Sequence, residues 1–270
     1  MPRFITFLTD FGLRDDFVGT CHGVMKRIAP DVQIIDITHG IEPHQVLQGA
    51  LVLAATLQYM PVGVHLAVVD PGVGGARRAV VLRDEERRLY VGPDNGLLVP
   101  AAEAGGGIVA AHELANPEYA LQPVSRTFHG RDLFAPAAAH LALGVSLEEL
   151  GPPLDPEVLV RLGLPEPKID AARIGASALY VDRFGNVQLN LAAEHLERAG
   201  ASPGTRVSLE LPGGSRKAVV ARTFADVAPG DTVLYEDSYG NVAIAVSRGN
   251  AAEALGLDAG QSVWIELKSL

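Results

Sequence analysis

Two short apolar runs in the N-terminal half end in the same way, with an aspartate and a glycine-containing turn. Residues 4–8 lead into Thr9-Asp10-Phe11-Gly12, and residues 64–69 lead into Asp70-Pro71-Gly72-Val73-Gly74-Gly75. Apolar runs of this length bounded by turn residues predict buried strands. In open α/β sheets, ligands bind outside the carboxyl ends of the strands. We therefore expect the Asp10 and Asp70 carboxylates to lie at a ligand-binding edge of a sheet.

The segments between and after these runs alternate between helical and extended patterns. Residues 17–29 carry apolar side chains every three or four positions until Pro30 ends the pattern. The further predicted elements are strands at 32–37 and 108–111, helices at 46–59, 97–104 and 133–143, and a hairpin pair at 79–82 and 89–91. Such alternation predicts an α/β domain with a mainly parallel sheet that helices cover on both faces.

The pattern changes after a proline-dense stretch. Residues 151–156 and 164–167 are rich in proline and suggest a linker. Seven short β-type runs follow, at residues 175–181, 187–191, 207–211, 218–220, 232–235, 242–246 and 262–267. They predict a small antiparallel β-barrel or sandwich. We therefore expect two domains: a catalytic α/β domain over residues 1–164 and a β-barrel domain over residues 165–270.

One phrase occurs twice in the second half, as Asp182-Arg183-Phe184-Gly185-Asn186 and as Asp237-Ser238-Tyr239-Gly240-Asn241. Glycine and asparagine are typical of tight hairpin turns, so the repeat predicts two such turns. That interpretation leaves open a further role for the side chains.

Composition excludes several kinds of partner. The 270 residues carry a formal net charge of −10 and have a pI near 5.2, whereas nucleic-acid binding depends on clustered lysine and arginine. Cys21 is the single cysteine, which fits a reducing compartment. The N-terminus lacks a signal-peptide pattern, and the apolar segment at 46–59 is too short to span a bilayer. We expect a cytoplasmic protein that binds neither nucleic acid nor membrane.

Familiar cofactor and catalytic motifs are missing. The sequence has neither the dinucleotide fingerprint Gly-x-Gly-x-x-Gly nor the phosphate-binding loop Gly-x-x-x-x-Gly-Lys-Ser/Thr nor a Gly-x-Ser-x-Gly elbow. Aspartates 10, 15, 16, 70 and 94 near predicted strand ends suggest a divalent metal, but His-x-His and His-Glu-x-x-His spacings are absent. We therefore expect no metal and no cofactor.

What remains is a set of Asp70, Arg77 and His129. His129 lies in the polar segment Thr127-Phe128-His129-Gly130-Arg131-Asp132, directly before an alanine-rich helix whose backbone N–H groups can hold a polar ligand atom. Taken singly, the aspartate and the arginine fit a surface ion pair, and the histidine fits a structural role. Together they suggest a site, because loops on rigid scaffolds often carry function.

These motifs, together with Pro93-Asp94-Asn95-Gly96, the Asp182–Asn186 phrase and residues 238–250, occur in order over nearly the whole chain. In this the sequence resembles the S-adenosyl-L-methionine (SAM) hydroxide adenosyltransferases, which are related to the SAM-dependent fluorinases and chlorinases. The resemblance implies an N-terminal α/β domain, a C-terminal β-barrel and a homotrimer with active sites between subunits. It also implies that water or hydroxide attacks C5′ of SAM and yields adenosine and L-methionine.

The resemblance also implies roles for individual residues. Asp70, Arg77 and His129 would form the water-activating set, and a carboxylate beside a guanidinium is a weak base, so they would orient water and accept its proton late. Asp10 would hold the ribose hydroxyls. The remaining substrate contacts would come from Asp70, Phe128, Asn186, Ser238 and the backbone near Ala243 and Val246.

Differences from the halogenating relatives favour hydroxide over halide. Those enzymes have tyrosine and threonine where this chain has Asp70 and Val73, an inserted loop after that segment, and a halide-contacting serine where this chain has Gly130. They also have tryptophan where this chain has His44, so the resemblance implies a different wall of the nucleoside pocket. Two alternatives remain: a chlorinase-like halide transferase, and a non-catalytic module that binds SAM or adenosine.

Overall fold

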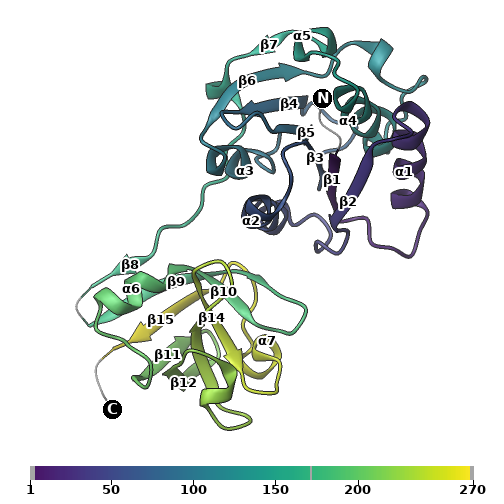
Figure 1. Ribbon diagram of the computed structural model, residues 1–270. Helices are drawn as coiled ribbons and strands as arrows, with labels where there is room; N and C mark the ends of the chain where they lie inside the picture. The colour runs from purple at the N-terminus through teal and green to yellow at the C-terminus, as the bar shows by residue number, and fades with distance from the viewer. Residues whose placement is uncertain (1–3, 171, 268–270) are drawn as a thin grey trace. The chain divides into compact units, whose positions relative to one another are not determined.

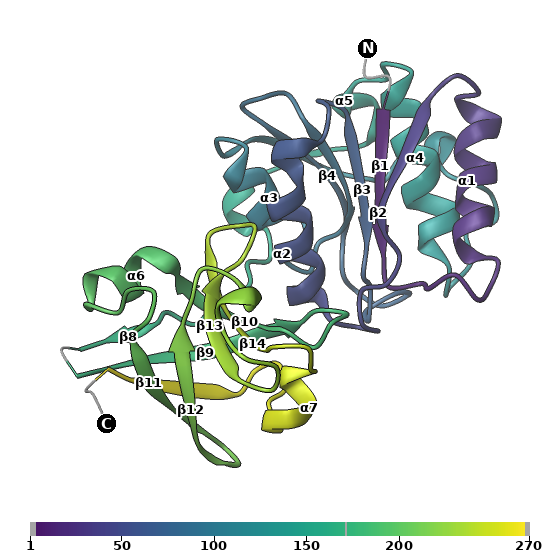
Figure 2. The ribbon, with the colours of Figure 1, turned by 60° about the horizontal axis from the view of Figure 1, so that its bottom comes forward.

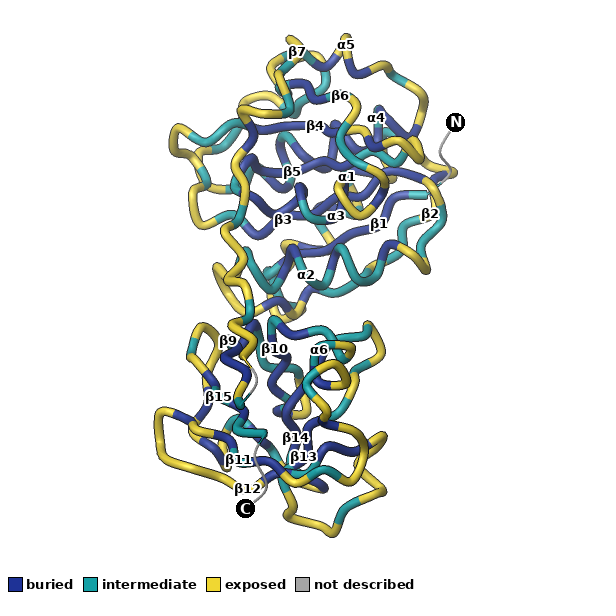
Figure 3. The backbone as a smooth tube through the Cα atoms, turned by 90° about the vertical axis from the view of Figure 1, so that its left-hand side faces the viewer, coloured by how far each residue is buried: buried dark blue, intermediate teal, exposed yellow. Residues whose placement is uncertain are grey.

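The computed structural model describes residues 4–170 and 172–267, and these form two compact units that divide between residues 162 and 163 (Figure 1). Each unit has its own hydrophobic core. In Figure 3 the strands of both units are mostly buried, whereas the connecting loops are mostly exposed. Within the described residues, no helix combines the length and the apolar character needed to cross a membrane.

A seven-stranded sheet is the centre of the first unit, with strand order β2-β1-β3-β5-β4-β6-β7. The neighbours β1–β2, β1–β3 and β3–β5 pair in parallel, and β4 runs antiparallel between β5 and β6. The predicted hairpin and the mainly parallel sheet are thus confirmed. The strands are β1 Phe4–Thr9, β2 Gln33–Thr38, β3 Val64–Val68, β4 Ala79–Asp84, β5 Leu89–Pro93, β6 Ile108–Glu113 and β7 Pro153–Leu154.

Helices cover both faces of this sheet, as the alternating pattern predicts (Figure 2). One face packs against α1 (Phe17–Ile28) and α4 (Ala135–Ala142), and the other packs against α2 (Val46–Thr56) and α3 (Val99–Ala104). Successive side chains of a strand point to opposite faces, so Phe7 of β1 joins the α1 side while Leu8 joins the α2 side. The short helical segments are η1 Leu57–Tyr59, η2 Pro117–Tyr119, η3 Gly130–Phe134, α5 Leu147–Leu150 and η4 Pro156–Val158.

Residues 151–156, which the sequence suggests as linker, are part of the first unit. Pro153–Leu154 pairs with β6 as a two-residue strand at the edge of the sheet, where the missing proline N–H costs no ladder hydrogen bond. Further on, Leu159 is buried in the core, and the Val160 N–H donates to Asp94 Oδ1 at 2.9 Å. Part of the proline-rich stretch is therefore an edge strand and not a linker.

The second unit is a closed barrel of seven strands, to which the short β8 is added at one side. The strand order is β10-β14-β13-β12-β11-β15-β9-β8, and pairing of β9 with β10 closes the barrel. Its pairings are antiparallel except for β12 with β13, so the expected small barrel is confirmed. The elements are β8 Lys168–Ile169, β9 Arg173–Val181, β10 Val187–Ala192, α6 Ala193–Arg198, β11 Arg206–Leu211, β12 Gly214–Val220, η5 Phe224–Asp226, β13 Thr232–Glu236, β14 Asn241–Val246, α7 Ala251–Leu255 and β15 Ser262–Glu266.

The repeated phrase forms two matching hairpin turns, as predicted. Asp182 Oδ1 accepts hydrogen bonds from the backbone of residues 184 and 186 between β9 and β10. Asp237 Oδ1 does the same for residues 239 and 241 between β13 and β14. Gly185 and Gly240 both have φ 83°, a left-handed conformation that glycine adopts without steric cost.

Candidate active site

Asp70, Arg77 and His129 lie in direct contact in the first unit, although 52 positions separate the arginine from the histidine. Asp70 follows the end of β3, Arg77 precedes β4, and His129 precedes η3. Arg77 Nε is 3.0 Å from each carboxylate oxygen of Asp70, and Arg77 Nη2 also donates to Oδ2. Arg77 Nη2 is 2.8 Å from His129 Nδ1. The guanidinium therefore joins the carboxylate to the imidazole.

This contact fixes the protonation of His129. An arginine only donates hydrogen bonds, so His129 Nδ1 must accept and the neutral ring carries its proton on Nε2. Burial and the positive charge of Arg77 lower the pKa of His129 from its ordinary value of 6.5. At neutral pH the imidazole thus offers one N–H donor beside a nearly buried carboxylate, whose side chain is 6% exposed.

We predict that NMR titration of His129 gives a pKa below 6.5, and that the Arg77→Gln substitution raises this pKa. Removing the guanidinium takes away a positive charge and leaves the Asp70 carboxylate free to favour imidazolium. His140, whose pKa is lowered by burial alone, serves as the internal control and should titrate as before. A pKa of His129 unchanged by the substitution would show that Arg77 does not set its charge.

Close packing of two loops holds the three side chains together. Gly74 lies in the turn between Asp70 and Arg77 with φ 75°, and a β-carbon there would collide with the carbonyl oxygen of Arg126. Arg126 is three residues before His129. Asp132, with a 2% exposed side chain, accepts hydrogen bonds from the Ser125 N–H and from Arg131. The loop that carries His129 is thus fixed at both ends.

Helix η3 begins at Gly130, three residues earlier than the predicted helix, and its first turn is a π-helix. Turns of this kind are rare in proteins, and those that occur are often found at functional sites. The 130–134 turn runs directly into α4, so His129 is held at the start of a continuous helical segment.

A hollow of about 160 Å³ joins these residues to Asp10. Its lining includes Asp10, Asp70, Phe128 and His129, which are four of the predicted site residues. Asp10 follows β1, the neighbour of β3, so both aspartates lie at the same edge of the sheet. The His44 N–H donates to Asp10 Oδ2 at 2.9 Å, which orients the carboxylate and leaves Oδ1 for a ligand.

Two aromatic rings, those of Phe11 and Phe128, line this hollow, and Phe17 packs against both. Phe11, Phe17 and Phe128 meet edge to face, with ring centroids 5.1 to 6.0 Å apart. A β-carbon at Gly130 would lie 2.9 Å from Cζ of Phe11, so the ring occupies the space that a serine would need. The wall is therefore apolar at the position where the resemblance places a halide-contacting serine in the fluorinases.

The second unit has its own hollow, of about 210 Å³, at the two matching hairpin turns. Asn186, Ser238 and Ala243 line it, whereas Val246 does not and packs against the barrel core. Asn186 Nδ2 donates to Asp182 Oδ2 at 2.8 Å, which leaves the Asn186 amide oxygen as an acceptor. The lining also includes the carboxylates of Asp182 and Asp237 and four aromatic residues: Tyr180, Phe224, Tyr235 and Tyr239.

Gln188 was missed by the sequence reasoning. It lies one pleat beyond Asn186 on β10, is 8% exposed and lines the same hollow. Its Oε1 is buried without a hydrogen-bond partner among the described residues. A buried acceptor without a partner is costly, so a ligand N–H donor would be stabilised there. Alternation from Asn186 along the strand was the available signal, since residues two apart share a face.

Of the other predicted strand-end carboxylates, Asp94 has a structural position. Asp94 has a 3% exposed side chain and accepts from Arg78 Nε at 2.9 Å and from the Val160 N–H. Its neighbour Asn95 donates to the carbonyl oxygen of Val69, immediately before Asp70. Asp15 and Asp16 are exposed. The Pro93-Asp94-Asn95-Gly96 motif therefore stabilises the backbone at the end of β3, next to Asp70.

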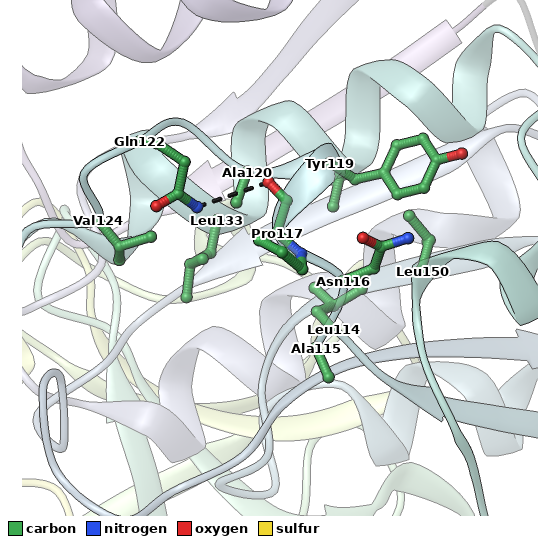
Figure 4. A pocket seen from close by; sticks show the side chains of 11 residues that line it. Leu114, Ala115, Asn116, Pro117, Tyr119, Ala120, Gln122, Val124, Leu133 and Leu150 are labelled. Atoms are coloured by element: carbon green, nitrogen blue, oxygen red, sulfur yellow. Dashed lines mark hydrogen bonds between the residues drawn. The ribbon is translucent and has the colours of Figure 1, made fainter.

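A further hollow of about 140 Å³ lies between η2 and α4 (Figure 4). Its lining is mostly apolar, and among the described residues that form it only Tyr119 titrates. Gln122 Nε2 closes one side by donating to the Pro117 carbonyl oxygen at 3.5 Å. It therefore offers little acid–base chemistry.

Comparison with known proteins identifies the family of the chain. Residues 5–151 match the model of the SAM hydroxide adenosyltransferase N-terminal domain, and residues 176–264 match that of the C-terminal domain. The chain belongs to the SAM hydroxide adenosyltransferase family.

Relatives extend over almost the full length. A Salinispora tropica protein named (R)-S-adenosyl-L-methionine hydrolase is 49% identical, with 97% of each chain covered. A Nocardia brasiliensis protein named fluorinase is 31% identical, over 97% of this chain and 96% of that one. A crystal structure of an uncharacterized conserved protein from Thermotoga maritima has a TM-score of 0.89 and 38% identity, and covers 97% of this chain and 99% of that one.

Proposed function

We propose that this protein hydrolyses S-adenosyl-L-methionine to adenosine and L-methionine. The observation that carries the proposal is the contact of Asp70, Arg77 and His129 at a hollow that Asp10 also lines. Family membership and the name of the 49% identical relative supply the substrate. A module that only binds SAM would need Asp10 but has no use for the linked carboxylate, guanidinium and imidazole.

The reaction is a displacement at C5′. A water oxygen forms a bond to C5′, the C5′–S bond breaks, and its electron pair goes to sulfur, which leaves as the neutral thioether of methionine. The cationic sulfonium loses its charge in the step, and a site that excludes water favours such charge loss. The near-buried Asp70 and the phenylalanine wall at Phe11 and Phe128 provide that environment.

Each member of the set then has a separate task. Asp70 accepts a hydrogen bond from the attacking water and takes its proton as the C–O bond forms. Arg77 fixes the carboxylate through both oxygens, and the Nε2–H of His129 orients the water oxygen. Placing the water in line with the C5′–S bond at about 3 to 3.5 Å would provide much of the acceleration.

Hydrolysis is favoured over halide transfer by the same residues. Asp70 is an anion where the resemblance gives the halogenating enzymes a neutral tyrosine, and an anionic carboxylate repels a halide. Gly130 lies against Phe11, which leaves no hydroxyl to hold a halide at that position.

We further propose that the enzyme is a homotrimer in which different subunits contribute the two hollows to each active site. Each hollow, of about 160 and about 210 Å³, is below the 300 Å³ or more that is typical of pockets for ligands of drug size. The barrel hollow offers flat aromatic rings, carboxylates and amide acceptors, which suit a purine and a cation. Neither hollow alone accounts for the whole substrate.

Product analysis tests the reaction. Incubation with SAM in ¹⁸O-labelled water is expected to yield adenosine and methionine in equal amounts, with one ¹⁸O in the 5′-hydroxyl of adenosine and none in methionine. We expect the same result with a chelator and with added chloride. Release of adenine or of methylthioadenosine, or formation of chlorinated adenosine, would contradict hydrolysis at C5′.

Subunit mixing tests the shared site. Asp70→Ala removes chemistry from the first unit, and Ser238→Trp fills the hollow of the second unit from an exposed position. Each variant alone is expected to be inactive. If sites lie between subunits, randomly mixed oligomers recover about a quarter of the wild-type sites. In those sites the intact first unit of one variant is paired with the intact second unit of the other. Mixed oligomers without any recovered activity would place the complete site within one subunit.

A further inference from the structure

Three side chains that the proposed mechanism does not use converge beside the strand ends of the first unit. His22 lies on α1, Asp36 lies on β2, and His39 follows the end of β2. Asp36 Oδ1 is 2.9 Å from His22 Nε2 and 3.2 Å from His39 Nε2. Within the described part of the chain, this is the group whose His, Asp, Glu or Cys ligand atoms lie close enough together to hold a metal ion.

His39 is oriented as a metal-binding histidine would be. It is 6% exposed, and its Nδ1 lies 2.9 Å from Thr9 Oγ1, a hydrogen bond that can keep the proton on Nδ1 and the lone pair on Nε2. Its Nε2 is buried and makes no hydrogen bond with adequate geometry among the described residues, although it points at the Asp36 carboxylate. With the proton on Nδ1, the Nε2 lone pair faces the carboxylate, an arrangement that a cation bound between them would stabilise.

The spacing of the three side chains leaves room for a small transition-metal ion after a small movement. Ligand bonds of about 2.0 to 2.1 Å in a tetrahedral site place neighbouring ligand atoms about 3.3 Å apart. The two observed distances, 2.9 and 3.2 Å, need an expansion of only a few tenths of an ångström. Two imidazoles and one carboxylate suit Zn²⁺, Co²⁺ or Ni²⁺, whereas Mg²⁺ and Ca²⁺ prefer oxygen ligands.

We propose that His22, Asp36 and His39 form a binding site for one divalent transition-metal ion, with water as the remaining ligand. The His22 and Asp36 side chains are 32% and 40% exposed, which leaves an open side for entry and for water.

The ion would stabilise the strand-end loop without taking part in the displacement. It would link α1 to the end of β2, and the His39 carbonyl oxygen accepts from the Gly12 N–H at 2.7 Å. Thr9 Oγ1, which bonds His39, also accepts from the Phe11 N–H at 3.1 Å. Residues 9–12, which carry Asp10, would therefore be held more firmly when the metal is bound. The proposal stands independently of the reaction assigned to the hollow.

The test uses the full-length protein stripped of metal with a chelator and dialysed. Titration with Zn²⁺ alone is expected to show one ion per subunit and an increase in melting temperature, and Co²⁺ should give the visible absorption of a tetrahedral site. The His22→Gln substitution changes a partly exposed helix residue and should weaken Zn²⁺ binding by at least about 10-fold. Asp36→Asn should act in the same direction. His140→Gln, on α4, is the matched control and should bind Zn²⁺ like the wild type.

Two results would overturn the proposal. One is a Zn²⁺ titration that shows no binding of one ion per subunit and no change in melting temperature. The other is Zn²⁺ affinity that His22→Gln and Asp36→Asn leave unchanged, which would place the ion elsewhere. The melting temperature of each metal-free variant shows whether it has folded, so loss of binding can be separated from loss of structure.

Discussion

Replacing Asp70 with alanine is expected to lower kcat for SAM hydrolysis by about 10² to 10⁴ and to change KM only a few-fold. The carboxylate matters most as the attacking water loses its proton, and general-base or orienting contacts of this kind typically contribute that much to a rate. The substitution also removes the partner that Arg77 contacts through Nε and Nη2, so the guanidinium loses its fixed position beside His129. Steady-state kinetics with adenosine as the measured product give both constants.

A variant that carries both Asp70→Ala and His129→Ala tests whether the two residues act together or independently. His129→Ala is expected to lower kcat to a similar extent, and Asp70→Ala with His129→Ala should be little worse than either alone, because Asp70 and His129 act on the same water. Asp10→Ala is the contrasting control. Its carboxylate would bind ribose hydroxyls in the ground state. The substitution should therefore weaken substrate binding by about 1.5 to 3 kcal/mol, which raises KM and leaves kcat nearly unchanged. Multiplied losses in the double variant would contradict a shared role.

The sequence was sufficient to predict elements whose pattern is local. Asp10 and Asp70 follow apolar runs and do lie at the ends of neighbouring strands. The hairpin turns at Asp182 and Asp237 are also local, because each aspartate bonds backbone N–H groups within four residues. In both cases the residues that determine the structure lie next to each other in the chain.

Contacts between distant segments could not be predicted in the same way. Asp94 resembles the other strand-end aspartates in sequence, yet it binds Arg78 and the backbone of Val160 and so supports the fold. The cluster of His22, Asp36 and His39 has no metal-binding spacing, because a helix and a strand end bring its members together. Neither pattern is visible until the sheet order is known.

Gln188 shows a second reason why part of the site could not be predicted from the sequence. Its position on β10 is predictable, but an amide at a strand position is ordinary until the closed barrel buries its oxygen without a partner. The resemblance places the backbone near Val246 at the substrate, and the Val246 side chain packs against the barrel core. Substrate contact through the backbone near Val246 stays a prediction.

Gly74→Ala is expected to lower kcat by about 10², although residue 74 itself is not among the residues proposed to act on the water. Its φ of 75° is unfavourable for alanine by about 1 to 2 kcal/mol, and the new methyl group would collide with the Arg126 carbonyl oxygen. Either the turn or the loop must move, so the contact between Arg77 and His129 would be disturbed. A displacement near 1 Å in a reacting set can reduce a rate by about 10²-fold.

Gly72→Ala is the matched control within the same turn. Gly72 has no left-handed conformation, and its β-carbon would lie 3.4 Å from Arg77 Cγ, an ordinary van der Waals contact. We therefore expect this variant to keep kcat within a few-fold of the wild type. The pKa of His129, followed by NMR, should rise in Gly74→Ala as Arg77 moves away and should not change in Gly72→Ala. Wild-type turnover in a folded Gly74→Ala variant would show that the close packing of turn and loop does not set the catalytic geometry.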